Sequence, residues 1–163
     1  MPMLARTLLA FLLLAAAPAT AQDAATATVT LAGTAIEPAT LTRASLAGLP
    51  RTELDVSFHT SKGEERGRYG GVLLWTLLER AGIGRSTGHH DELRRSILVT
   101  GRDGYAILFS AGEIAPEFGA KPIILATDKD GAPLSARDGL RVIVPGDKRG
   151  ARSVRDVAMI EVR

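Results

Sequence analysis

The densest cluster of charge in the chain lies close to its C-terminal end. Within the eight residues 148–155 there are four cations: Lys148, Arg149, Arg152 and Arg155. A guanidinium group pairs with the oxygens of a phosphate, and a glycine such as Gly150 lets backbone N–H groups approach an anion. This spacing favours two interpretations, an anion-binding turn and an ordinary solvated basic turn. The anion-binding interpretation names four site residues: Lys148, Gly150, Arg152 and Arg155.

The histidines give a second and weaker signal. His59 ends a predicted strand at the start of a loop, where an imidazole can contact a cofactor, act as a base or lie on the surface. We include it among the cofactor-binding candidates. His89 and His90 precede Asp91, but adjacent residues seldom face one metal ion, so we predict a solvated loop there and no metal site.

The composition excludes several classes of function. The chain has 163 residues and no cysteine, which excludes disulfides, iron–sulfur clusters and thiolate chemistry. Twenty Lys and Arg residues against 18 Asp and Glu residues give a net charge of +2, too balanced for nucleic-acid binding by bulk charge. Neither a Gly-x-Ser-x-Gly nucleophile elbow nor a phosphate-loop motif occurs.

Residues 1–21 have the pattern of a secretory signal. Leu8–Ala17 is an uninterrupted apolar stretch, Pro18 breaks it, and an A-x-A cleavage site ends at Ala21. The stretch is shorter than the ~20 residues that span a bilayer. We expect cleavage to leave residues 22–163 as one soluble domain without a membrane span; an uncleaved anchor is the alternative. An Ala/Leu-rich signal is typical of bacteria, so we expect a periplasmic protein.

Short strands dominate the predicted elements. Apolar patterning predicts strands over residues 28–33, 53–59, 96–100, 105–110, 123–127, 141–144 and 157–162. The charged residues 61–68 predict a loop or hairpin tip, and Asp103-Gly104 predicts a tight turn between two strands. Many strands with few helices predict an α+β fold rather than a doubly wound sheet.

One main helix is predicted over residues 73–81, followed by the helix-ending Gly82. Its apolar positions follow the i, i+3, i+4, i+7 spacing of one helical face: Leu74, Leu77, Leu78 and Ala81. Trp75 falls outside this stripe, so we expect it at the edge of the core. Short helical turns are predicted after Thr42, as a cap, and after Ser110, which has capping-box spacing with Glu113.

From about Gly70 onward the sequence resembles the oxidoreductase molybdopterin-binding domain, the fold of sulfite oxidase and its periplasmic relatives. Five motifs occur in the order of that family, at residues 70–82 (GGVLLWTLLERAG), 103–105 (DGY), 125–134 (LATDKDGAPL), 138–145 (DGLRVIVP) and 150–162 (GARSVRDVAMIEV). The resemblance implies a mixed, β-rich single domain of the sulfite oxidase type, with one main helix and short helical turns. It also implies that the basic residues after Gly150 meet the phosphate of the cofactor.

The chain departs from that family at one chemically important position. Catalytic members hold molybdenum through a cysteine soon after the strand equivalent to residues 54–58, whereas this chain has Phe58-His59-Thr60-Ser61 there. A hydroxyl or an imidazole does not replace a soft thiolate ligand. The chain thus resembles a compact, stand-alone, periplasmic version of the domain that lacks the molybdenum-ligand cysteine.

Two functional hypotheses follow, and they leave open whether the protein is an enzyme. The preferred one is a non-catalytic binding module for an anionic small molecule, a pterin-like cofactor or a partner protein. The alternative is a molybdopterin-dependent oxidoreductase, or a subunit of one, with His59 or Ser61 as an atypical metal ligand. The residues themselves assign no cofactor; molybdopterin is implied by the resemblance.

Overall fold

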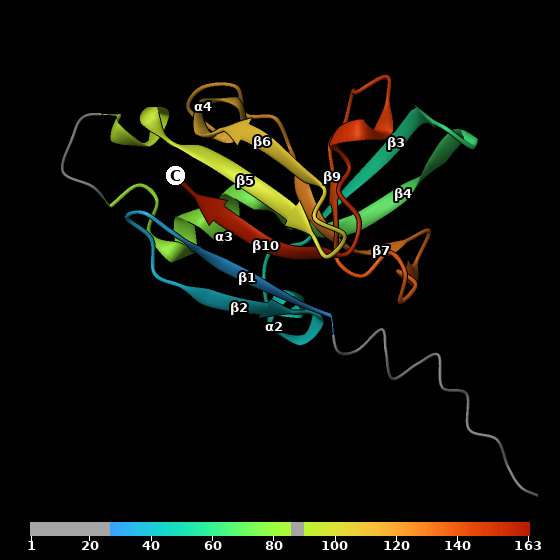
Figure 1. Ribbon diagram of the computed structural model, residues 1–163, viewed down its shortest axis with the longest axis horizontal. Coiled ribbons are helices and arrows are strands. Elements are labelled where there is room, and N and C mark those ends of the chain that lie inside the picture. The colour runs from blue at the N-terminus through green and yellow to red at the C-terminus, as the bar shows by residue number, and fades with distance from the viewer. Residues whose placement is uncertain (1–26, 86–89) are drawn as a thin grey trace, which may run out of the picture.

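The computed structural model describes residues 27–85 and 90–163, which form two five-stranded sheets (Figure 1). The first sheet has the order β2 (Ala39–Thr42), β1 (Thr28–Gly33), β10 (Val157–Val162), β5 (Ser96–Gly101) and β6 (Ala106–Ser110). β1 and β10 pair in parallel, although they lie at opposite ends of the described chain, and the other neighbours pair antiparallel. This pairing joins the beginning and the end of the domain in one sheet.

The second sheet carries the long hairpin that leads to the candidate site. It contains β3 (Thr52–Thr60), β4 (Gly63–Leu73), β7 (Ile124–Lys129), β8 (Ala132–Pro133) and β9 (Arg141–Ile143). β4 lies between β3 and β7, and β9 also pairs with β7. The mixed, strand-rich architecture with few helices confirms the predicted α+β class.

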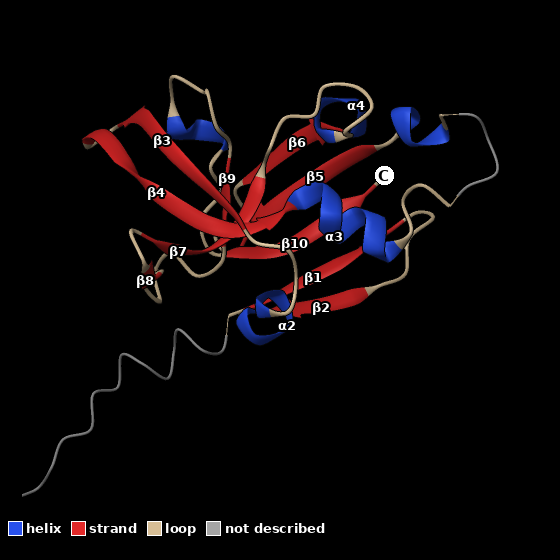
Figure 2. Cartoon of the chain, turned by 180° about the vertical axis from the view of Figure 1, so that it is seen from behind, coloured by secondary structure: helices blue, strands red, loops and turns tan. Residues whose placement is uncertain are grey.

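The helical elements are short. They are α2 (Arg43–Ala47), α3 (Leu74–Ala81), α4 (Ala111–Ile114) and the 3₁₀ turns η1 (Asp91–Arg94) and η2 (Gly150–Arg152). Figure 2 shows α3 lying across β10 and β5 of the first sheet. The predicted main helix is confirmed to within one residue, and so is the cap of α2, where the Thr42 side chain accepts a hydrogen bond from the Ser45 N–H.

Two apolar clusters hold these layers together. All four predicted positions of the α3 stripe are buried, and they pack with residues of the first sheet such as Val29, Ile97 and Ile160. Trp75 packs at the edge of this larger core, as predicted. The smaller cluster lies in the second sheet and includes Phe58 and Tyr69. It forms the apolar floor beside the candidate site.

Two local predictions were wrong in whole or in part. The hairpin tip predicted within residues 61–68 is confirmed at Ser61 and Lys62, but the rest of that range is not a loop, because β4 begins at Gly63 and pairs with β3 from Thr60↔Gly63 onward. Residues 63–68 contain glycines and charged residues and no apolar residue, so the sequence shows no apolar alternation that would indicate a strand there. The capping box between Ser110 and Glu113 does not form: the Ser110 side chain makes no cap hydrogen bond, and Glu113 accepts one from Arg152 at 2.9 Å instead.

The expected signal at residues 1–21, the expected new N-terminus at Gln22 and His89 lie outside the described residues. Within residues 27–85 and 90–163, no helix has both the length and the apolar character needed to cross a membrane.

Candidate functional site

A pocket of about 370 Å³ opens where β3 ends, between the β5–β6 turn and η2. We call it the basic pocket because three arginines line it. Its lining residues are His59, Thr60, Ser61, Asp103, Tyr105, Arg141, Arg149, Gly150, Ala151, Ser153 and Arg155. Segments that are far apart in the sequence therefore meet at one place on the surface.

Backbone contacts fix the walls of the basic pocket. The His59 N–H donates to the Lys148 carbonyl at 3.0 Å, so the end of β3 pairs with the segment that enters η2. On the other side, the Tyr105 hydroxyl donates to the Ala151 carbonyl at 2.8 Å. The β5–β6 turn and η2 are thus tied together across the pocket.

Gly150 is required here by close packing. A Cβ atom at this position would lie 2.6 Å from Cδ2 of the Phe58 ring, closer than carbon atoms can approach. The absence of a side chain lets η2 rest directly on the apolar floor. The sequence singled out Gly150 as a residue that lets an anion approach, and the structure adds a packing reason for the same residue.

Three of the five residues predicted for the site line the basic pocket: His59, Gly150 and Arg155. The structure does not bring Arg152 to them. Its Nε and Nη2 atoms donate to the Asp147 carboxylate at 2.7 Å each, and its Nη1 atom donates to Glu113 at 2.9 Å. Lys148 is exposed and contributes its backbone carbonyl to the wall. The expected convergence of Lys148, Arg152 and Arg155 is therefore not what the structure shows.

The Arg152 cluster is a structural clasp that ties η2 to α4. Lys121 joins it with a 3.1 Å hydrogen bond to Asp147, so two cations face two carboxylates. The hydrogen bond from Arg152 is the main reason that the pKa of Asp147 lies below its usual value. These charges satisfy one another and are not directed at a ligand.

Sequence reasoning missed Arg149 and Arg141 as pocket residues. Arg149 belongs to the same basic run, and among the residues that the structure describes no hydrogen bond or ion pair engages its side chain. Arg141 is only 3% exposed. The sequence did contain a signal for Arg141, because this charged residue begins the apolar stretch Val142–Val144, which is predicted to be buried. An arginine is almost never fully buried without a partner, so its position indicated an ion pair inside the fold.

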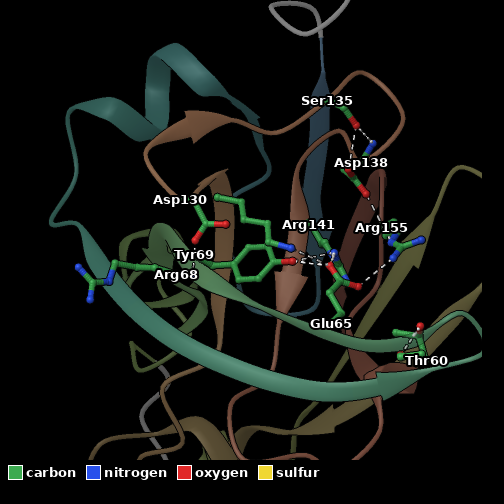
Figure 3. Close-up of polar contacts among 11 residues, drawn as sticks. Thr60, Glu65, Arg68, Tyr69, Asp130, Ser135, Asp138, Arg141 and Arg155 are labelled. Atoms are coloured by element: carbon green, nitrogen blue, oxygen red, sulfur yellow. Dashed lines mark hydrogen bonds and ion pairs between the residues drawn. The ribbon is translucent and has the colours of Figure 1, made fainter.

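Arg141 belongs to a network centred on one carboxylate, that of Glu65 on β4 (Figure 3). Arg141 donates to both Glu65 oxygens, at 2.7 Å and 3.3 Å, and the Tyr69 hydroxyl donates to Glu65 at 2.5 Å. The Arg155 guanidinium lies 3.1 Å from the same carboxylate, and the Lys129 ammonium lies 3.5 Å from it. Three cations and a phenol thus surround one anion.

The network changes the protonation of both Glu65 and Tyr69. Burial opposes the charge on Glu65, but hydrogen bonds from Arg141 and Tyr69, with the charges of Arg141 and Lys129, outweigh it and lower its pKa to about 2. Burial and the hydrogen bond to Glu65 raise the pKa of Tyr69. Glu65 is therefore ionised and Tyr69 is neutral at physiological pH.

We expect the stability of the protein to depend on Glu65 at acid pH. Because the folded-state pKa lies below the ordinary value of 4.5, the carboxylate stabilises the fold above pH 4.5 and this contribution is lost as the pH falls toward about 2. Its size is on the order of a few kcal/mol. Urea denaturation of the wild type and of Glu65→Gln across this range measures it, with the exposed Glu117→Gln as the control. Equal pH slopes in all three proteins would contradict the assignment.

A larger groove of about 770 Å³ lies on the β3–β4 hairpin beside the turn at Asp130 and Gly131. Its charges pair with one another: Arg68 contacts Asp55 at 3.1 Å, and Arg66 contacts Glu64 at 2.9 Å. The basic pocket is the better candidate because it combines a cation free of such pairing with a histidine and hydroxyl groups.

Comparison with known proteins agrees with this architecture. The family model described as "Oxidoreductase molybdopterin binding domain" matches residues 16–163. The chain is also similar in structure to the sulfane dehydrogenase SoxCD from Paracoccus pantotrophus, with a TM-score of 0.69 and 18% sequence identity. That match covers 85% of this chain but only 38% of the other, so it shows the shared fold. No curated protein matches the sequence. Since the family model covers nearly the whole chain, the protein belongs to the oxidoreductase molybdopterin-binding domain family.

Proposed function

We propose that this protein is a non-catalytic binding module that holds an anionic small molecule in the basic pocket. The observation that carries the proposal is the position of Arg149, a pocket-lining cation whose side chain is not engaged by any other described residue. Arg155 and His59 lie in the same lining. A volume of about 370 Å³ is within the range of ligand pockets, roughly 300–1,000 Å³. A pterin-like molecule that carries a phosphate is the ligand class that the family suggests.

The donor groups of the basic pocket fit the anionic part of such a cofactor but do not fit its metal. Guanidinium, imidazole and hydroxyl groups are suited to phosphate oxygens. The chain contains no cysteine to supply a thiolate, and the described residues contain no group of three His, Asp or Glu side chains that could hold a metal ion. We therefore propose binding without molybdenum chemistry. A protein that presents a carboxylate or phosphate is a further partner that this pocket could accept.

Phosphate should stabilise the wild-type protein through Arg149. We expect the midpoint of thermal unfolding to rise with phosphate at constant ionic strength; at ~100 times the dissociation constant, one bound ligand adds ~2.7 kcal/mol. Arg149→Ala should lose this response because it removes the free cation from the lining. Equal responses to phosphate in wild type and Arg149→Ala would contradict the proposal.

Arg152→Ala is the matched control for this experiment. It removes the same side chain from the same basic run, but the guanidinium that it removes is bound to Asp147 and Glu113. We expect a lower unfolding temperature without phosphate and an undiminished response to phosphate. The two arginine variants thus separate loss of the clasp from loss of the ligand site.

A second candidate function is a molybdopterin-dependent oxidoreductase with an atypical ligand. The observation that favours it is that both candidate ligands, His59 and Ser61, line the basic pocket. One molybdenum per chain, in protein isolated from a host that makes the cofactor, would support this candidate over the binding module.

We also propose that the protein is exported to the periplasm. The apolar stretch Leu8–Ala17 and the cleavage site that ends at Ala21 support this. N-terminal sequencing of the exported protein should begin at Gln22, and a chain that retains Leu8–Ala17 would contradict the proposal.

A further inference from the structure

Glu65 does not line the basic pocket, yet its carboxylate contacts two of the three arginines that do. Its Oε2 atom lies 3.3 Å from Nη2 of Arg141 and 3.1 Å from Nη2 of Arg155. Arg155 has a second carboxylate neighbour, since its Nε atom lies 3.4 Å from Asp138. Figure 3 shows Glu65 between the two guanidinium groups, with Asp138 on the far side of Arg155.

These contacts decide how much positive charge is left for a ligand. The ion pair with Glu65 neutralises the charge of Arg141, and Arg155 forms ion pairs with both Glu65 and Asp138. The lining itself also contains Asp103, whose carboxylate accepts a hydrogen bond from the Tyr105 N–H. Only Arg149 remains as a cation without a carboxylate partner in the described lining.

Glu65 is held too firmly to leave when a ligand arrives. Four groups contact its carboxylate: Arg141, Arg155, Tyr69 and Lys129. Arg141 is buried and its guanidinium lies 5.5 Å from the centre of the Tyr69 ring, so its position is fixed by packing. Displacing Glu65 would leave a buried guanidinium without a counter-charge, which is strongly unfavourable.

We propose that Glu65 is the residue that sets the charge specificity of the basic pocket, an inference that rests on the proposed anion-binding function. As a permanent internal anion it neutralises Arg141 and reduces the charge of Arg155. The pocket then favours a doubly charged group over a singly charged one less strongly than its three arginines alone would. The physical reason is that the repulsion between Glu65 and a bound anion grows in proportion to the charge of that anion.

Two probes of similar shape and different charge test this inference: sulfate, with two negative charges, and methyl sulfate, with one. Dissociation constants are measured by calorimetry for the wild type and Glu65→Gln, with Glu117→Gln as the exposed control. We expect Glu65→Gln to bind sulfate about tenfold more tightly and methyl sulfate about threefold more tightly, because the Coulomb energy scales with ligand charge. Glu117→Gln should change neither constant.

Asp138→Asn is the second variant, because Asp138 contacts Arg155 and not the buried Arg141. It should shift the sulfate-to-methyl sulfate preference in the same direction by a smaller factor, and it carries the test if Glu65→Gln does not fold. An unchanged preference in the variants, with wild-type binding that depends on Arg149, would overturn the role of Glu65 and leave the proposed function intact. Failure of the wild type to bind either anion would overturn the proposed function itself.

Discussion

Leu77→Ala is expected to lower the free energy of unfolding by ~2–5 kcal/mol. Leu77 is 2% exposed and lies on the face of α3 that packs into the larger core, so the smaller side chain leaves a cavity that its neighbours fill only in part. Urea denaturation measures the loss. Leu108→Ala is the matched control, since Leu108 on β6 is 57% exposed and the same change should cost less than ~0.5 kcal/mol. A loss below ~1 kcal/mol for Leu77→Ala would contradict the position of α3.

Arg141→Met is expected to cost ~3–5 kcal/mol, because it leaves the Glu65 carboxylate in a partly buried place without its main partner. The double variant Arg141→Met/Glu65→Leu should recover much of this loss, since both charges are then gone and apolar side chains of similar size replace them. Urea denaturation of the wild type, of the single variants Arg141→Met and Glu65→Leu and of the double variant forms a complete cycle. If the double variant loses as much as the sum of the single variants, the two residues are not coupled and the network is misassigned.

The elements that could be predicted from the sequence are those with a strong local signal. The apolar stripe from Leu74 to Ala81, followed by Gly82, specified α3 to within one residue. Gly82 adopts a positive φ of 100°, as expected for a glycine that ends a helix. The β5–β6 hairpin followed from Asp103-Gly104 between two apolar runs. In each case the residues that determine the structure are neighbours in the sequence.

β4 could not be predicted over residues 63–68, because its charged side chains are satisfied by residues elsewhere in the chain. Glu65 faces Arg141, which lies 76 positions further along, and Arg68 pairs across the hairpin with Asp55. A pattern of local polarity indicates a loop when such partners are unknown. The pairing that makes these charges part of a strand is tertiary.

The candidate site was predictable by region and not by residue. The basic run and Gly150 do lie at a pocket, but η2 intervenes within the run, so Arg149 and Arg155 line the pocket while Arg152 binds Asp147. Residue spacing alone could not separate them, because the partner Glu113 is 39 positions away. Which cation is left free for a ligand depends on where the carboxylates of the fold lie.

Native mass spectrometry of the protein, isolated from a host that makes the molybdopterin cofactor, tests the proposed function most directly. The predicted result is a retained anionic small molecule without molybdenum, whose signal is lost in Arg149→Ala and kept in Arg152→Ala. One molybdenum per chain in the wild type would contradict the binding-module function and favour the oxidoreductase with His59 or Ser61 as ligand.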